Sequence, residues 1–63
     1  MTTFEIEFAR LSTMSKKAII EEGVERGFFN STPSNVAYMM RNYSKILLSR
    51  KVADKIIWAQ NNL

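Results

Sequence analysis

The sequence predicts an all-α fold, with a single small domain of three or four helices over residues 1–63. Apolar residues recur at helical spacing through residues 32–49, and residue types suited to helix ends flank such stretches. Only one short segment alternates as a strand would, and we find no convincing second strand for it. The helices that we expect lie near residues 3–11, 15–26, 33–48 and 50–61.

The first segment fits either a strand or a helix. Phe4, Ile6 and Phe8 alternate with glutamates, which is the strand pattern. However, Phe4, Phe8 and Leu11 also share one helical face, and Thr2 followed three residues later by Glu5 fits a capping box. A lone strand would need a partner, such as its own copy in a dimer, so we favour a helix.

The second helix is expected to end at a glycine. Gly27 follows residues 15–26, where a left-handed residue commonly terminates a helix. Ile20 and Val24 belong to its buried edge. Gly23 lies inside the helix, at a cost of about 1 kcal/mol relative to alanine. Close approach of another helix is one reason for a glycine there, and chance is the other.

The third helix has the clearest start in the chain. Thr32 can cap free backbone N–H groups, and Pro33 at the first helical position loses no hydrogen bond. The predicted buried stripe consists of Val36, Met40, Tyr43 and Leu47, and Met39 and Ile46 widen it at its edges.

The number of helices after residue 33 is left open by the sequence. No proline or glycine follows Pro33, but the later apolar stripe of Val52, Ile56, Ala59 and Leu63 falls on roughly the opposite side of a continuous helix. A monomer therefore requires a break near residues 48–51, with Ser49 capping a fourth helix. A dimer would permit one unbroken helix.

Composition excludes several classes of protein. With neither cysteine nor histidine, we expect no enzyme, no metal site and no cofactor. A chain of 63 residues buries a limited core, so its many apolar residues favour a homodimer. No run approaches the roughly 20 apolar residues of a membrane span, and the acidic N-terminus is unlike a signal peptide. We expect a cytoplasmic protein that does not enter a membrane.

Charge is distributed unequally along the chain. The net charge is +3 at pH 7. Residues 1–30 contain four cations and five acids, whereas residues 31–63 contain five cations and one acid. The C-terminal half is thus net +4, which indicates an anionic partner or simply a hydrated basic surface.

The polar face of the third helix predicts a non-enzymatic DNA-binding regulatory module. Asparagine can pair with adenine, arginine with guanine, and lysine with phosphate. The predicted contacts are Ser34, Asn35, Tyr38, Arg41, Asn42, Lys45 and Arg50. The order of a helix, a turn at Gly27 and a capped helix resembles a helix-turn-helix in outline, which implies that the third helix enters the major groove. The turn is about three residues longer than the compact motif allows.

Two alternatives remain open. In a ribbon-helix-helix dimer, residues 3–9 would form the ribbon, but Glu5 and Glu7 would then face the DNA. The other alternative is a small inhibitor or adaptor that docks on a larger protein. Methionine and aromatic residues are common at such interfaces. The candidate contacts are Met39, Ile57 and Trp58, of which Trp58 either covers the core edge or anchors a partner.

Overall fold

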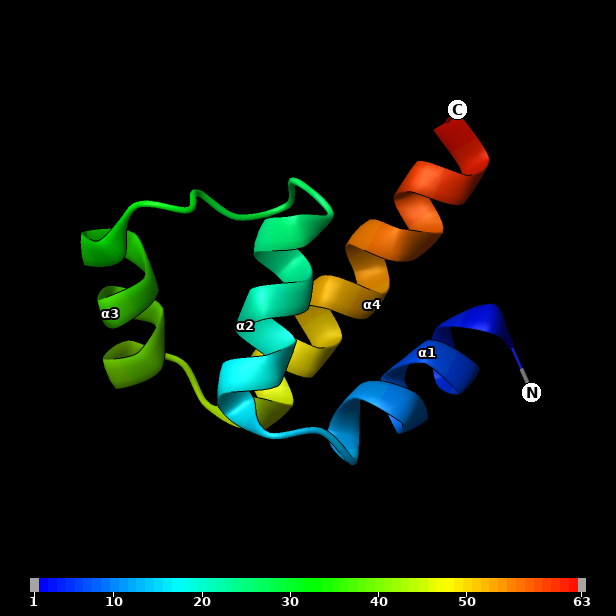
Figure 1. The fold of residues 1–63 in the computed structure, drawn as a ribbon. Coiled ribbons are helices and arrows are strands. Elements are labelled where there is room, and N and C mark those ends of the chain that lie inside the picture. Colours follow the sequence, from blue (N-terminus) through cyan, green and yellow to red (C-terminus); the bar gives the residue numbers. More distant parts are fainter. Residues whose placement is uncertain (1, 63) are drawn as a thin grey trace.

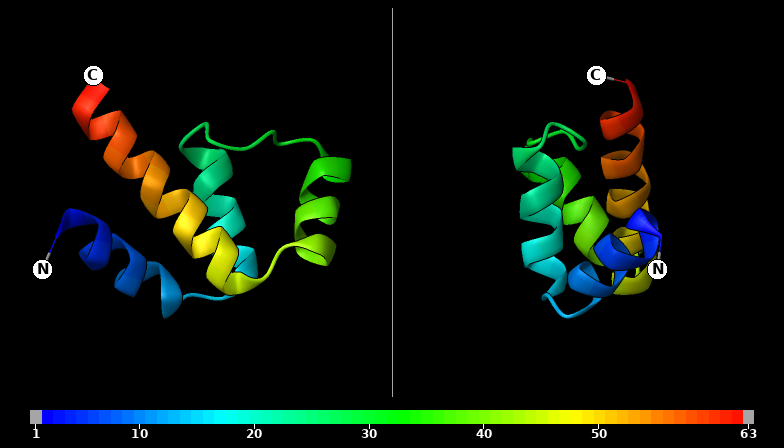
Figure 2. Two further views of the ribbon diagram at one scale, coloured as in Figure 1. Left: turned by 180° about the vertical axis from the view of Figure 1, so that it is seen from behind. Right: turned by 90° about the vertical axis from the view of Figure 1, so that its right-hand side faces the viewer.

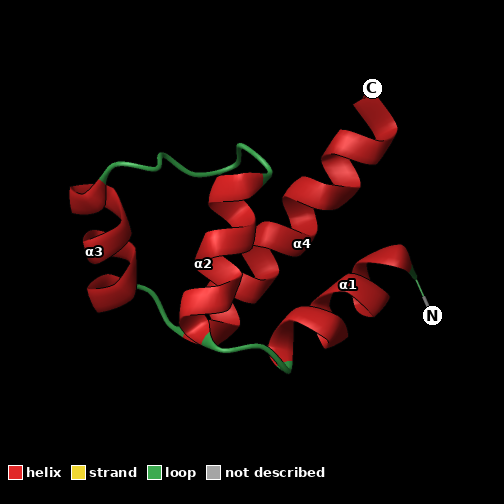
Figure 3. Cartoon of the chain, viewed as in Figure 1, coloured by secondary structure: helices red, strands yellow, loops and turns green. Residues whose placement is uncertain are grey.

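The computed structural model describes residues 2–62 and contains four helices with no strand among them. Their bounds are α1 Thr3–Ser12, α2 Lys16–Glu25, α3 Pro33–Asn42 and α4 Lys45–Asn62. The all-α prediction is confirmed (Figures 1 and 3). Leu63, which we expected in the last apolar stripe, lies outside the described residues.

The ambiguous first segment is a helix. The Thr2 hydroxyl accepts a hydrogen bond from the Glu5 backbone N–H at 3.1 Å, as the capping pattern predicts. Leu11 is fully buried, and the Phe4 and Phe8 rings stack with their centroids 5.7 Å apart. Ile6, the third member of the strand pattern, is half exposed. The ribbon-helix-helix alternative is therefore wrong, because its ribbon is helical.

Helix α2 begins and ends as the sequence predicts. The Ser15 hydroxyl accepts a hydrogen bond from the Ala18 N–H at its start. At its end Gly27 adopts φ = 82°, and the N–H of Phe28 donates to the carbonyl of Gly23 at 2.8 Å. This pattern of a left-handed glycine and a bond from the following residue defines the Schellman motif, which satisfies carbonyl groups at the helix end.

Gly23 is required by an aromatic side chain rather than by a neighbouring helix. A Cβ atom added to Gly23 would overlap the Phe29 ring. The chain turns back at Gly27, so Phe29 lies over the helix from which it has just emerged. Phe28 and Phe29 both pack against the core and fix residues 28–29 to α2.

The core is centred on α4, against which both α1 and α2 pack (Figures 1 and 2). The small residues Ser49 and Ala53 are fully buried on α4. The Ser49 hydroxyl donates to the Lys45 carbonyl at 2.9 Å, so this buried polar group is satisfied. The buried hydrophobic residues are Leu11, Ile19, Ile20, Met39, Leu48, Val52, Ala53 and Ile56.

The break between the last two helices lies at residues 43–44, not at 48–51. Tyr43 is extended, with φ = −110° and ψ = 141°, and ends α3. The Ser44 hydroxyl then accepts a hydrogen bond from the Leu47 N–H at 3.1 Å, the geometry of a helix N-cap. The predicted cap, Ser49, instead lies inside α4.

This earlier break corrects the predicted buried stripe of the third helix. Met40 and Leu47 are each 39% exposed, and Ile46 is 71% exposed. Met39, which we placed at the stripe's edge, is buried. With residues 45–49 belonging to a differently oriented helix, the periodicity of residues 36–47 no longer describes one face.

Helix α3 stands at the end of the molecule away from both chain termini (Figures 1 and 2). Met39 is its one buried residue and packs into the core cluster. The Lys16 ammonium group at the start of α2 donates to the Met40 carbonyl in the last turn of α3. This helix is thus connected to the bundle mainly through its C-terminal half.

Candidate functional site

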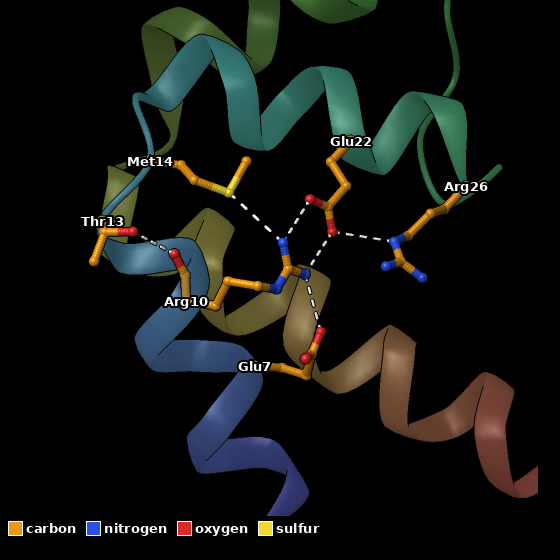
Figure 4. A network of polar contacts seen from close by, with 6 residues as sticks. All are labelled: Glu7, Arg10, Thr13, Met14, Glu22 and Arg26. Atoms are coloured by element: carbon orange, nitrogen blue, oxygen red, sulfur yellow. Dashed lines mark hydrogen bonds and ion pairs between the residues drawn. The ribbon is translucent and has the colours of Figure 1, made fainter.

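The ion pairs of the described residues all lie on α1 and α2. The Arg10 guanidinium on α1 bonds both carboxylate oxygens of Glu22 on α2, at 2.9 and 2.8 Å (Figure 4). It also bonds Glu7 at 2.9 Å, and Arg26 bonds Glu22 at 3.1 Å. These hydrogen bonds raise the pKa of Arg10 and lower the pKa of Glu22, whose partial burial acts in the opposite direction. Two of the four cations in residues 1–30, Arg10 and Arg26, are therefore paired with glutamates.

The cations of α3 and α4 have no such partners. Among the described residues, none of these five side chains forms an ion pair. All five are exposed: Arg41, Lys45, Arg50, Lys51 and Lys55. Asp54 is the one acid in residues 33–62. The surface of these two helices therefore retains its net positive charge.

The predicted polar face of α3 divides into two parts. Ser34, Tyr38 and Arg41 are exposed and, at about 100° per residue, lie on the side away from Met39. Asn35 is partly buried on the other side, where its amide nitrogen donates to the Asn30 carbonyl at 2.9 Å.

Asn42 is exposed, but its amide is also engaged. Its nitrogen donates to the Tyr38 carbonyl at 2.9 Å. A bidentate contact with adenine needs both a donor and an acceptor from one amide. For Asn42, and for Asn35 in the same way, that contact would require the existing bond to be shared or broken.

The predicted cations lie on either side of the helix break. Arg41 is in the last turn of α3, and Lys45 is the first residue of α4. Arg50 is also exposed, roughly 7.5 Å further along α4 at 1.5 Å per residue. The structure thus groups Arg41 and Lys45 at the α3–α4 turn and separates them from Arg50.

A groove lies between α3, the segment before it and α4. Its volume is about 540 Å³. Its walls are formed by Phe28, Phe29, Asn30, Asn35, Tyr38, Met39, Tyr43, Lys51, Asp54 and Lys55. A second hollow of about 370 Å³ shares Phe28, Asp54 and Lys55 with it and reaches Trp58. We call the two together the aromatic groove.

Aromatic rings and lysines are adjacent in this groove. Tyr38 and Tyr43 meet edge to face, with centroids 5.9 Å apart and planes at 89°. The Lys51 ammonium group lies 5.5 Å from the centre of the Tyr43 ring, within the range of a cation–π contact. Tyr43 was predicted to be a core residue and is partly buried against the core, but it also lines the groove. Lys51 and Lys55 were not predicted as site residues. A signal for them was the spacing of Lys51, Lys55 and Trp58, which predicts one shared face on a helix.

The three residues predicted for the protein-docking alternative differ in how far they are buried. Met39 is only 3% exposed, so it belongs to the core and offers no contact surface. Ile57 is half-buried. Trp58 is 65% exposed and lies at the edge of the aromatic groove, rather than covering the core.

The connection between α2 and α3 in the structure is longer than the turn of a helix-turn-helix, as the sequence indicates. Residues 26–32 separate α2 from α3. Asn30 stabilises this connection through two contacts: its side chain accepts from the Thr32 N–H, and its carbonyl accepts from Asn35. The compact motif joins its helices by a much shorter turn.

The fold and this surface define a small all-α protein of four helices with a basic, aromatic-lined groove. Comparison of the chain with protein-family models, with curated proteins and with solved structures finds no match. Residues 2–62 contain no group of three or more acids that could hold a metal ion. None of the described helices has the length and apolar character needed to cross a bilayer.

Proposed function

We propose that this chain is a non-enzymatic regulatory module that binds nucleic acid through α3 and α4. The observation that carries the proposal is the separation of charge. Arginines on α1 and α2 are paired with glutamates, whereas the five cations of α3 and α4 have no ion-pair partner among the described residues. A basic surface that the protein does not neutralise itself suits a polyanion.

The contacts follow from side-chain chemistry. Arg41 and Lys45 at the α3–α4 turn, with Arg50 beyond them, provide charge for phosphates. Ser34 and Tyr38 supply exposed hydroxyl groups on the same side of α3 as Arg41. Insertion of α3 into a duplex major groove, as the sequence predicts, would bring these groups to the bases and backbone.

Salt dependence of binding tests this proposal. Fluorescence anisotropy with a labelled duplex should give an affinity that falls steeply as salt rises. Arg41→Gln combined with Lys45→Gln should weaken binding and reduce the slope of log K against log salt by roughly 1–2, since each phosphate contact contributes about 0.9.

Lys17→Gln is the matched control for each single change, because Lys17 is an exposed cation on α2 with no ion pair in residues 2–62. It removes the same charge from α2, which carries none of the proposed contacts, and should therefore have a smaller effect. Equal losses for Lys17→Gln and Arg41→Gln, or no binding of any nucleic acid at low salt, would contradict the proposal.

A second candidate is docking on a larger protein. This candidate is favoured by Trp58, because its side chain is 65% exposed and tryptophan is a common anchor residue in interfaces. Trp58→Ala should then abolish capture of a partner that survives nuclease treatment, while Arg41→Gln should leave capture intact. Loss of capture with nuclease alone would exclude this candidate.

A further inference from the structure

We propose that the aromatic groove binds unpaired bases, so that the preferred ligand is a single-stranded nucleic acid. This inference rests on the proposed binding of nucleic acid by α3 and α4, but it places the preferred contacts in the aromatic groove instead of in a duplex major groove. The juxtaposition that carries it is the set of aromatic rings between α3 and α4 together with two lysines. Proteins that bind single strands combine these two features, a basic groove for the backbone and rings on which bases stack.

The exposed rings lie at different positions along the groove. Tyr38 on α3 is 52% exposed, and Trp58 on α4 is 65% exposed. Phe28 lines both hollows and so lies between them. Tyr43 meets Tyr38 in a T-shaped contact and carries Lys51 over its ring. Successive bases laid along the groove would therefore meet ring surfaces at more than one point.

The lysines have the spacing of a backbone track. Lys51 and Lys55 are one helical turn apart on α4, roughly 6 Å along its axis. At about 100° per residue they share the face of Trp58. Both are exposed, and neither forms an ion pair among the described residues. Phosphates can thus be bound beside the rings.

Asp54 is the one acid in the groove. Its carboxylate repels phosphate, but it accepts hydrogen bonds from the amino groups of bases, as acidic residues do with cytosine. Asp54 lines both hollows, so its carboxylate favours exposed base edges there over a second line of phosphates.

The groove favours a single strand over a duplex. Paired bases are stacked on one another and present only their edges, so the faces of Tyr38 and Trp58 would find no partner. Helix α3 itself carries one cation, Arg41, and its two asparagine amides already bond backbone carbonyls. The groove therefore offers more exposed rings for stacking than α3 offers free side-chain groups for reading base edges.

An acidic peptide with apolar anchors is the competing occupant. Arg41, Lys45 and Arg50 are exposed on the same two helices but outside the groove, so the cations extend beyond the ring-lined part. A charged backbone that continues past its bound bases matches this arrangement, and a peptide with one short acidic stretch would leave the outer cations without partners. Charge therefore favours the nucleic acid.

The experiment uses Trp58 as its reporter, because it is the only tryptophan in the chain. A 15-nucleotide single strand, a hairpin duplex and inorganic polyphosphate are titrated separately into the full chain at low salt. A base stacked on the indole should quench its emission, whereas polyphosphate should bind the cations without that quenching. Anisotropy with the same labelled oligonucleotides gives the affinities.

We expect the single strand to bind more tightly than the duplex. Trp58→Ala should weaken single-strand binding about tenfold or more, and Tyr38→Leu should act similarly, because each removes a stacking surface. Ile46→Ala is the matched control, since Ile46 is 71% exposed but does not line the groove. Circular dichroism checks that each variant keeps the helical fold.

The outcomes separate this inference from the proposed function. Equal affinity for both strand forms, with no effect of Trp58→Ala or Tyr38→Leu, would overturn the groove assignment and leave nucleic-acid binding in place. Absence of binding to every oligonucleotide would overturn both. Quenching by an acidic amphipathic peptide but not by the single strand would assign the groove to a protein partner.

Discussion

Arg10 is the residue that joins α1 to α2 by charge. Its guanidinium lies between Glu7 on its own helix and Glu22 on α2, and it also approaches the Met14 sulfur (Figure 4). The Arg10 side chain is 40% exposed, so solvent weakens these pairs and we assign the network about 0.5–1 kcal/mol. The interaction between Arg10 and Glu22 is directional because it is bidentate: the planar guanidinium group matches the geometry of the carboxylate.

The network predicts a specific dependence of stability on pH. Because Arg10 lowers the pKa of Glu22 in the folded state, this pair stabilises the fold above the usual glutamate pKa of about 4.3. That stability is lost as the pH falls through the lowered pKa. Glu22→Gln should therefore reduce the midpoint of thermal unfolding by roughly 2–8 °C at pH 7. The difference from the wild type should disappear once the pH is below the lowered pKa of Glu22.

Glu21→Gln provides the comparison for this measurement. Glu21 is the exposed neighbour of Glu22 and forms no ion pair within residues 2–62. Its substitution removes the same charge and should change the midpoint little at either pH. If the midpoint of Glu22→Gln stays equally far below that of the wild type in acid, the carboxylate charge is not the cause of the lower stability.

Gly23 is the residue whose substitution gives the opposite of what helix propensity predicts. Alanine would gain about 1 kcal/mol within a helix. The added methyl group, however, overlaps the Phe29 ring, which is itself packed on the core. We expect Gly23→Ala to reduce the free energy of unfolding by about 1–3 kcal/mol in urea titrations.

A double-mutant cycle with Phe29→Leu tests this cause. The smaller side chain should make Gly23→Ala less costly, so the two changes should be coupled. The cost of Gly23→Ala should be the same in both backgrounds if the Phe29 ring is not responsible. The sequence alone placed Gly23 correctly in a helix, but it gave no means of choosing Phe29 as its neighbour.

At the scale of elements, the helix ends were more predictable than the helix faces. Thr2, Ser15 and Thr32 each accept a hydrogen bond from the first turn, as their sequence positions predict. These are local contacts, which require no knowledge of the rest of the fold. The break at Tyr43–Ser44 was missed because Tyr43 fitted the apolar stripe and Ser44 was not considered as a cap.

The candidate site was less predictable for a related reason. The polar face of α3 was found by periodicity, and most of it is exposed. The aromatic groove joins Phe28 and Tyr38 to Lys55 and Trp58, which lie far apart in sequence. Such a juxtaposition depends on the direction in which the chain returns after residue 44, and no local pattern encodes that direction.

Helix α3 should open more readily than the other three. It contributes one buried side chain, Met39, whereas α4 contributes five buried residues. Helix α1 also contributes only one, Leu11, but it packs closely along α4, whereas the packing of α3 against α2 is sparse. Native-state hydrogen exchange should therefore show α3 amides exchanging at least about tenfold faster than those in the centre of α4. Met39→Ala should accelerate exchange most in α3, because Met39 is the one buried residue that α3 contributes to the core.

Leu48→Ala serves as the contrasting variant. Leu48 is fully buried on α4, so its truncation should reduce protection throughout the bundle, by about 2–5 kcal/mol of global stability. Equal acceleration of all four helices by Met39→Ala would contradict the independence of α3.

At the scale of the whole molecule, the exposed surface bears on self-association. The chain leaves 4303 Å² accessible, close to the roughly 4,200 Å² expected for a compact monomer of this mass. The break at residues 43–44 also removes the unbroken helix as a reason for a dimer. What still favours a homodimer is the group of exposed large hydrophobic side chains: Ile6, Tyr38, Met40, Ile46, Leu47 and Trp58.

A homodimer would then be an association of two folded chains, with a mass that depends on concentration. Light scattering at micromolar concentration should give a mass of twice the 7.3 kDa of one chain. On dilution, the measured mass should fall toward that of one chain. A constant mass of 7.3 kDa at every concentration would show that these side chains do not mediate association.

The packing of α1 against α4 has a consequence for the order in which the chain is made. Phe4, Phe8 and Leu11 are synthesised before the surface that covers them, because that surface belongs to α4. During translation α1 has no docking surface until residues 48–56 emerge. Docking of α1 is therefore expected to wait for the synthesis of α4, and chaperones or aggregation would compete for the undocked α1 in the meantime.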